Sequence, residues 1–130
     1  MVVHGETIVE PVEKGTNKAA LSSSYVDILA HPGLLTEEEA LLAARNGVFL
    51  ELSARRGHCL TNGHVAKIAL HADAKLILDS DAHEPGDLLD SQLAEEIAHG
   101  AGLAGKDITT LLRDNTLSLL NRLGIKIAQE

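Results

Sequence analysis

Aromatic residues, cysteine and basic residues are all scarce in this 130-residue chain. Aromatic side chains make up 2% of the sequence and hydrophobic residues 45%, so the core is expected to consist of leucine, alanine, valine and isoleucine. A single cysteine, Cys59, cannot form a disulfide within the chain, which predicts a reducing, cytoplasmic location. The 11 basic and 19 acidic residues give a net charge of −8, which argues against a nucleic-acid partner.

Long apolar runs are also missing. No segment approaches the roughly 20 apolar residues that a membrane-spanning helix requires, and the first residues lack the hydrophobic region of a signal peptide. We therefore expect no membrane partner. The length suits one domain, so residues 1–130 are treated as a single unit.

One segment gives the first indication of chemistry. Ala74 and the run Leu76-Ile77-Leu78 predict a buried strand, which ends in Asp-Ser-Asp-Ala-His. Asp81 and His83 are two residues apart, so an extended backbone would project both side chains in the same direction. A carboxylate and an imidazole together suit a metal site. The same residue types are common in ordinary loops, so the rest of the chain has to decide.

Strand-like and helix-like segments alternate along the chain. The strand-like runs start near residues 2, 26, 48 and 75, a spacing of roughly 22 to 27 residues that is typical of repeated βα units with parallel strands. Helices are predicted over 17–22, 37–46, 63–72, 91–101 and 116–123, with a further short one after Asp107. The N-caps predicted for these helices are Asn17, Thr36 (in a capping box with Glu39), Asn62, Asp107 and Asn115.

The carboxyl ends of parallel strands share one edge of a sheet, and titratable residues lie at each predicted end. His4, His31, Glu51, Asp81 and His83 are therefore expected to gather. Imidazoles combined with carboxylates suit Zn²⁺, Mn²⁺ or Fe²⁺. Such an ion would lower the pKa of a bound water towards 7, and a pair of ions would also hold a phosphate group.

The loop after the third predicted strand adds candidates for phosphate binding. Arg55 could receive phosphate oxygens, and His58 could touch a ligand from the same loop, whereas Arg56 is expected to be solvated. The remaining histidines are expected at helix surfaces: His64, His71 and His99.

Three segments resemble motifs of the polymerase and histidinol phosphatase (PHP) superfamily. They are Val3-His4-Gly5-Glu6, the run Asp27-Ile28-Leu29-Ala30-His31-Pro32-Gly33, and Ser80-Asp81-Ala82-His83. The segments Leu50-Glu51-Leu52 and Thr61-Asn62-Gly63 fit the same pattern. The resemblance runs from about Val2 to Leu123.

What the resemblance implies is a distorted, TIM-like (β/α)₇ barrel whose two- or three-metal site hydrolyses phosphate esters. On that pattern His4 and His31 match ligands of one metal, Asp81 matches a ligand of a second, and His83 matches a ligand of a third. The expected fold class is therefore α/β, with four parallel βα units forming part of a PHP-type barrel.

The sequence also departs from the family. The His-x-His motif that opens a PHP domain and its bridging glutamate have no counterpart before His4, so the chain resembles the C-terminal half of the domain. Glu6, Glu51 or Asp79 could replace the bridging carboxylate. A half-barrel leaves open strand edges and an apolar inner face, which predicts a homo-oligomer, such as a dimer, or a complementary N-terminal half.

We therefore expect a metal-dependent phosphoesterase that hydrolyses a small phosphate monoester through a metal-activated hydroxide. A non-catalytic metal-binding or assembly remnant of a PHP domain is the alternative, and an amidohydrolase-like metal hydrolase is a weaker one. The missing ligands favour the remnant for a lone chain. The presence together of His4, His31, Asp81 and His83 favours the enzyme.

Overall fold

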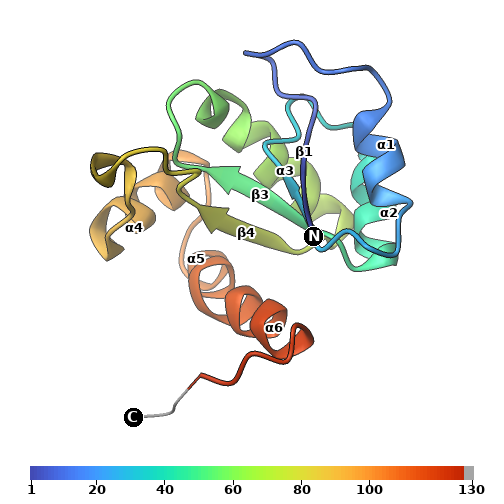
Figure 1. Ribbon diagram of the computed structural model, residues 1–130. Helices are drawn as coiled ribbons and strands as arrows, with labels where there is room; N and C mark the ends of the chain where they lie inside the picture. The colour runs from blue at the N-terminus through green and yellow to red at the C-terminus, as the bar shows by residue number, and fades with distance from the viewer. Residues whose placement is uncertain (128–130) are drawn as a thin grey trace.

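The computed structural model describes residues 1–127 and contains a parallel four-stranded sheet flanked by helices (Figure 1). The strands follow one another in chain order across the sheet, and each pairs in parallel with the next. This confirms the predicted α/β class and the parallel βα units. The strands are β1 (Val2–His4), β2 (Ile28–Ala30), β3 (Phe49–Ser53) and β4 (Leu76–Asp79).

The helices that connect the strands lie together on one face of the sheet. Right-handed crossovers that always advance in the same direction place their helices on the same side. The connecting helices are α1 (Thr16–Leu21), α2 (Glu37–Asn46) and α3 (Asn62–Ala72), and their core is built with Leu29, Leu50, Leu52 and Leu76 from the strands. As predicted, this core consists of leucine, alanine and valine.

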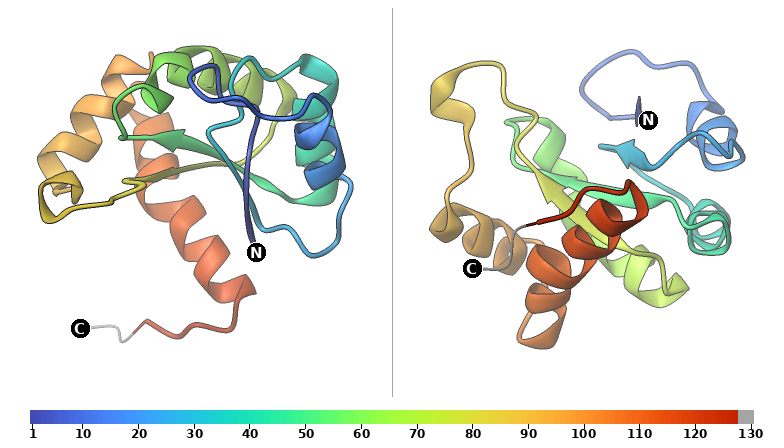
Figure 2. Two further views of the ribbon diagram at one scale, coloured as in Figure 1. Left: turned by 45° about the horizontal axis from the view of Figure 1, so that its top comes forward. Right: turned by 60° about the horizontal axis from the view of Figure 1, so that its bottom comes forward.

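After β4 the chain first extends the same core with Ala98, Ala101 and Leu103, and it then crosses to the other face of the sheet. Helix α4 (Ser91–Gly100) is followed by α5 (Lys106–Thr109), a π-helical turn (Thr110–Asp114) and α6 (Asn115–Arg122). Figure 2 shows α6 on the side of the sheet opposite α3. There Leu119 of α6 packs on Phe49 and Ile77, which form a small second core with the half-buried Ile28.

This second face changes character along the strands. Side chains alternate between faces, so the residues that follow Phe49 and Ile77 on the same face are Glu51 and Asp79. The face is thus apolar at the amino ends of the strands, where α6 covers it, and acidic at the carboxyl ends. The expectation of an uncovered apolar inner face is wrong for the part beneath α6.

Several predicted helix starts are wrong, for a common physical reason. Thr36 does cap α2 in a capping box with Glu39, and Gly47 ends that helix. By contrast, Asn17, Asn62 and Asn115 lie inside helices, and each bonds to a distant segment instead. An asparagine amide both donates and accepts, so it can join two elements, and local sequence does not reveal which role it takes.

Two further details differ from prediction. Asp107 lies within α5 and makes no cap, because the N-cap position of this helix is held by Gly105. Strand β2 also begins two residues later than predicted, at Ile28.

Among residues 1–127, no helix is both long and apolar enough to cross a membrane.

Candidate metal centre

Three histidines from separate segments meet at the carboxyl edge of the sheet. His4 ends β1, His31 directly follows β2, and His58 begins a 3₁₀ turn after β3 (His58–Thr61). Each offers one ring nitrogen, and these three atoms lie within 4.8 Å of one another. His31 and His58 are buried and stacked, with ring centroids 4.0 Å apart, while His4 meets His31 edge-on at 4.2 Å.

The His31 ring is oriented by a buried carboxylate. Glu51 accepts the backbone N–H of His31 at 2.5 Å and its Nδ1–H at 3.0 Å. The proton on Nδ1 leaves the lone pair on Nε2, and within residues 1–127 this buried atom has no hydrogen-bond partner. An orphaned, buried imidazole nitrogen is costly unless a ligand satisfies it, and a carboxylate–histidine pair is the usual support for a metal-bound imidazole.

The other two rings are held in the same manner. His4 Nδ1 lies 3.1 Å from the carbonyl oxygen of Gly5, and His58 Nδ1 lies 2.8 Å from the buried hydroxyl of Thr7. Each imidazole is thus fixed through Nδ1 by a neighbouring oxygen. This leaves Nε2 as the nitrogen that could bind a metal, and in His4 and His58 this atom faces the carboxylate of Glu10.

The protein environment favours the neutral form of the two inner imidazoles, His31 and His58. Burial lowers the pKa of His31, and the neighbouring His4 lowers it further. Burial also lowers the pKa of His58, and His31 adds to that effect. Only the neutral imidazole can donate a lone pair to a metal, so both shifts favour metal binding near neutral pH. The donor set therefore fits Zn²⁺, Mn²⁺ or Fe²⁺.

The half-buried Asp79 and the buried Glu51 form a carboxyl pair next to His31. Burial and the hydrogen bond to Glu51 raise the pKa of Asp79 to about 7, and burial also raises the pKa of Glu51. In its protonated form Asp79 donates a hydrogen bond to the Glu51 carboxylate, and this carboxylate accepts two hydrogen bonds from His31. Glu51 thus orients His31 directly, and Asp79 does so through Glu51, without either residue joining the imidazole cluster.

Asp81 and His83 do not join the three-histidine cluster. Asp81 adopts a left-handed backbone conformation, with φ of 45°, so the expectation of an extended Asp81–His83 segment is wrong. Arg55 lies between them and donates to Asp81 Oδ2 at 3.2 Å, while its Nη1 lies 2.8 Å from the ring nitrogens of His83. Asp81 Oδ2 is 3.9 Å from His58 Nε2, so this second group adjoins the first.

Glu6 has a structural position. Its two carboxylate oxygens accept the backbone N–H groups of Gly15 and Asn17, which fixes the start of α1. Gly33 secures the loop after His31: its φ is +67°, and a Cβ there would lie 2.0 Å from the carbonyl oxygen of Glu6. Only glycine permits this close approach of the β1 and β2 loops.

The other basic candidates lie at the surface or pair with backbone. Arg56 is exposed, as predicted, and so are His71 and His99. His64 is half-buried, with Nε2 2.7 Å from the carbonyl oxygen of Leu35, so its predicted solvation is wrong. Sequence reasoning gave His58 only a possible phosphate contact, whereas the structure places it in the imidazole cluster.

Glu10 was missed altogether. Its carboxylate lies 3.0 Å from His4 Nε2 and 3.4 Å from His58 Nε2. Glu10 belongs to the loop between β1 and α1, and no local sequence pattern marks it. Glu10 reaches the histidines because this loop folds back over the strand ends, and the local sequence does not predict that course of the loop.

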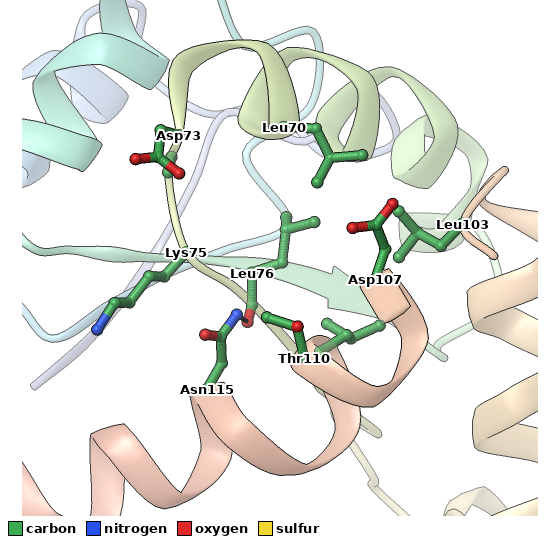
Figure 3. A pocket seen from close by; sticks show the side chains of 10 residues that line it. Leu70, Asp73, Lys75, Leu76, Leu103, Asp107, Thr110 and Asn115 are labelled. Carbon is green, nitrogen blue, oxygen red and sulfur yellow. Dashed lines mark hydrogen bonds between the residues drawn. The ribbon is translucent and has the colours of Figure 1, made fainter. Parts of the chain in front are cut away.

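A separate pocket of about 300 Å³ opens at the opposite end of the sheet, where β4 begins (Figure 3). Leu70 and Leu103 give it an apolar wall, and the carboxylates of Asp73 and Asp107 lie near its rim. Its lining residues are all different from those of the histidine cluster. This pocket is therefore separate from the candidate metal centre, and a substrate bound in it would not reach the histidine cluster.

Comparison with known proteins adds one relative. An uncharacterized protein of Methanocaldococcus jannaschii is 46% identical to this chain over 123 residues, which cover 95% of the chain and 56% of the relative. The chain thus spans just over half the length of that relative. No protein-family model matches the sequence, and no solved structure matches it.

Proposed function

We propose that this chain carries the metal-binding part of a PHP-type phosphoesterase, which hydrolyses a small phosphate monoester in the cytoplasm. The observation that carries the proposal is the convergence of three imidazoles, one of them with an orphaned, buried Nε2. A divalent ion bound there would act as a Lewis acid and would acidify a water molecule. The resemblance of the His4, His31 and Asp81–His83 segments to PHP motifs supplies the reaction class.

The residues of the chain have distinct tasks in this proposal. His4, His31 and His58 hold the ion, and Glu51 keeps the His31 proton on Nδ1. The Arg55 side chain is 35% exposed beside the cluster and can receive phosphate oxygens with its guanidinium group.

The fold supports a partial barrel. Strands in consecutive order with their connecting helices on one face are the repeating unit of a (β/α) barrel. Among residues 1–127, β1 and β4 each have only one partner strand, so within this part of the chain both edges of the four-stranded sheet are open. We propose that a second copy of the chain, or a separate N-terminal half, pairs with these edges and completes a barrel of PHP type.

A non-catalytic remnant is the second candidate, and one observation favours it. Glu6, Glu51 and Asp79, the three residues considered as bridging carboxylates, all make other contacts. A site with two metal ions therefore requires a bridging carboxylate other than these three. In this alternative the chain binds an ion but does not hydrolyse phosphate esters.

A phosphatase assay separates the two candidates. The purified chain is incubated with a chromogenic aryl phosphate and Mn²⁺ or Zn²⁺. The enzyme proposal predicts hydrolysis that is lost in His31→Ala and His58→Ala but retained in His99→Ala, because His99 is exposed on α4 and is not part of the histidine cluster. Metal binding without hydrolysis above buffer supports the remnant.

A further inference from the structure

One carboxylate joins the two outer members of the imidazole cluster. Glu10 Oε2 lies 3.0 Å from His4 Nε2, and Glu10 Oε1 lies 3.4 Å from His58 Nε2. Among residues 1–127, these two imidazoles are the ionisable groups with which Glu10 pairs. Both contacts are made to the ring nitrogens that a metal ion would use.

The loop between β1 and α1 is built around this contact. It carries Thr7, whose buried hydroxyl holds His58 Nδ1. It also carries Val9, whose side chain packs beside Gly57, the residue before His58. A Cβ added to Gly57 would lie 3.5 Å from the Val9 side chain. Two anchors on the His58 segment therefore position the loop, and they leave the Glu10 carboxylate above the cluster.

The distances from the Glu10 oxygens to His4 and His58 match those between two ligand atoms of one metal ion. Ligand atoms that each lie about 2.0–2.1 Å from one ion are about 2.9 Å apart at octahedral angles and about 3.4 Å apart at tetrahedral angles. The distances from the Glu10 oxygens to His4 and His58, 3.0 and 3.4 Å, fall within this range. We propose that Glu10 is a further ligand of the metal ion held by the three histidines.

Charge and exposure support this assignment over Asp81, the other nearby carboxylate. Asp81 Oδ2 is farther from His58 Nε2, at 3.9 Å, and it is paired with Arg55. Within the described residues the ionisable partners of Glu10 are imidazoles, which are neutral as ligands and leave the charge of a divalent ion uncompensated. Its side chain is 45% exposed, so the carboxylate can turn towards an entering ion without leaving a buried charge behind.

This inference rests on the proposed metal centre, and the test separates the two. The wild-type chain is titrated with Co²⁺, and the d–d absorption spectrum and dissociation constant are recorded. The same measurements are made on Glu10→Gln and on Glu13→Gln, a matched exposed glutamate in the same loop. Circular dichroism checks that each variant is folded.

If Glu10 is a ligand, Glu10→Gln changes the intensity and position of the cobalt bands and weakens binding about tenfold or more, while Glu13→Gln matches the wild type. Glu10→Asp, which keeps a shorter carboxylate, has an intermediate affinity. Wild-type binding with unchanged spectra and affinity in Glu10→Gln overturns the ligand assignment and leaves the three-histidine centre intact. Failure of the wild-type chain to bind Co²⁺ overturns both.

Discussion

Glu51 accepts two hydrogen bonds from one residue, His31: the backbone N–H at 2.5 Å and the ring Nδ1–H at 3.0 Å. Both residues are buried, with side chains 2% and 5% exposed respectively. The carboxylate therefore fixes the position of the His31 backbone, the orientation of its ring and its tautomer. The histidine cluster depends on a glutamate that is not itself a member.

Replacing Glu51 with glutamine is expected to weaken metal binding about 10- to 100-fold without unfolding the protein. The amide oxygen can still accept the His31 bonds, but it lacks the negative charge that makes the imidazole a stronger ligand. Isothermal titration with Zn²⁺ measures the change, and Glu95→Gln on the exposed surface of α4 is the control. Equal affinities in the two variants would contradict this role of Glu51.

The Asp79–Glu51 pair predicts a pH-dependent stability in metal-free protein. The pKa of Asp79 is raised from 3.8 to about 7, so between these values the native state holds a proton that the unfolded chain has released. The contribution of Asp79 to the free energy of unfolding therefore falls as the pH rises from about 4 to 7, by at most about 4 kcal/mol.

Asparagine at position 79 removes this titration and isolates it from that of the histidines. The difference in unfolding free energy, wild type minus Asp79→Asn, should become smaller from pH 5 to pH 8 in urea titrations with a chelator present. A difference that is constant, or that grows with pH, would show that Asp79 titrates normally in the native protein.

Gly5, next to His4, lies in a tightly packed position where a larger side chain is expected to lower stability. A Cβ on Gly5 would lie 2.6 Å from the carbonyl oxygen of Ala30 and 2.8 Å from Pro32 Cα, so Gly5→Ala must push β1 away from β2. We expect a loss of about 1–3 kcal/mol of stability and weaker metal binding, because His4 moves with the strand. Gly100→Ala, with nothing within 4 Å of the added methyl group, should leave both unchanged or slightly raise stability. Thermal unfolding and metal titration of the pair provide the check.

The open edge at β1 predicts self-association in the absence of another partner. Val2 is 59% exposed on this edge strand and aligns with Ile28 of the neighbouring strand. Light scattering after size-exclusion chromatography should show a dimer at micromolar concentration, and Val2→Lys should yield monomers, because a lysine on a strand edge opposes pairing. A wild-type chain that stays monomeric would refute self-association.

The sequence predicted the parts of the site that depend on topology. His4 and His31 both follow apolar strands, and parallel strands bring their carboxyl ends to one edge, so their proximity follows from the βα pattern. The contribution of His58 depends on a 3₁₀ turn and on a hydrogen bond to Thr7, 51 residues away in the chain. Such a long-range contact leaves no trace in the local pattern.

The errors have equally specific causes. The extended backbone assumed for Asp81 and His83 is wrong, because Asp81 adopts a left-handed conformation; their side chains both contact Arg55, outside the imidazole cluster. Glu51 was considered as a bridging ligand, but its partner is the backbone and ring of His31. Alternation within a strand predicts which face a side chain occupies, but it does not predict which group the side chain meets there.

The central claim is that three imidazoles form a metal site, and a direct binding measurement tests it. The metal-free chain, its His31→Ala variant and its His99→Ala variant are titrated with Zn²⁺ against a chromogenic chelator of known affinity. The structure predicts tight binding by the wild type and by His99→Ala, and a loss of at least about 100-fold in His31→Ala. Absence of binding by the wild type, or equal binding by all three proteins, would contradict the metal centre.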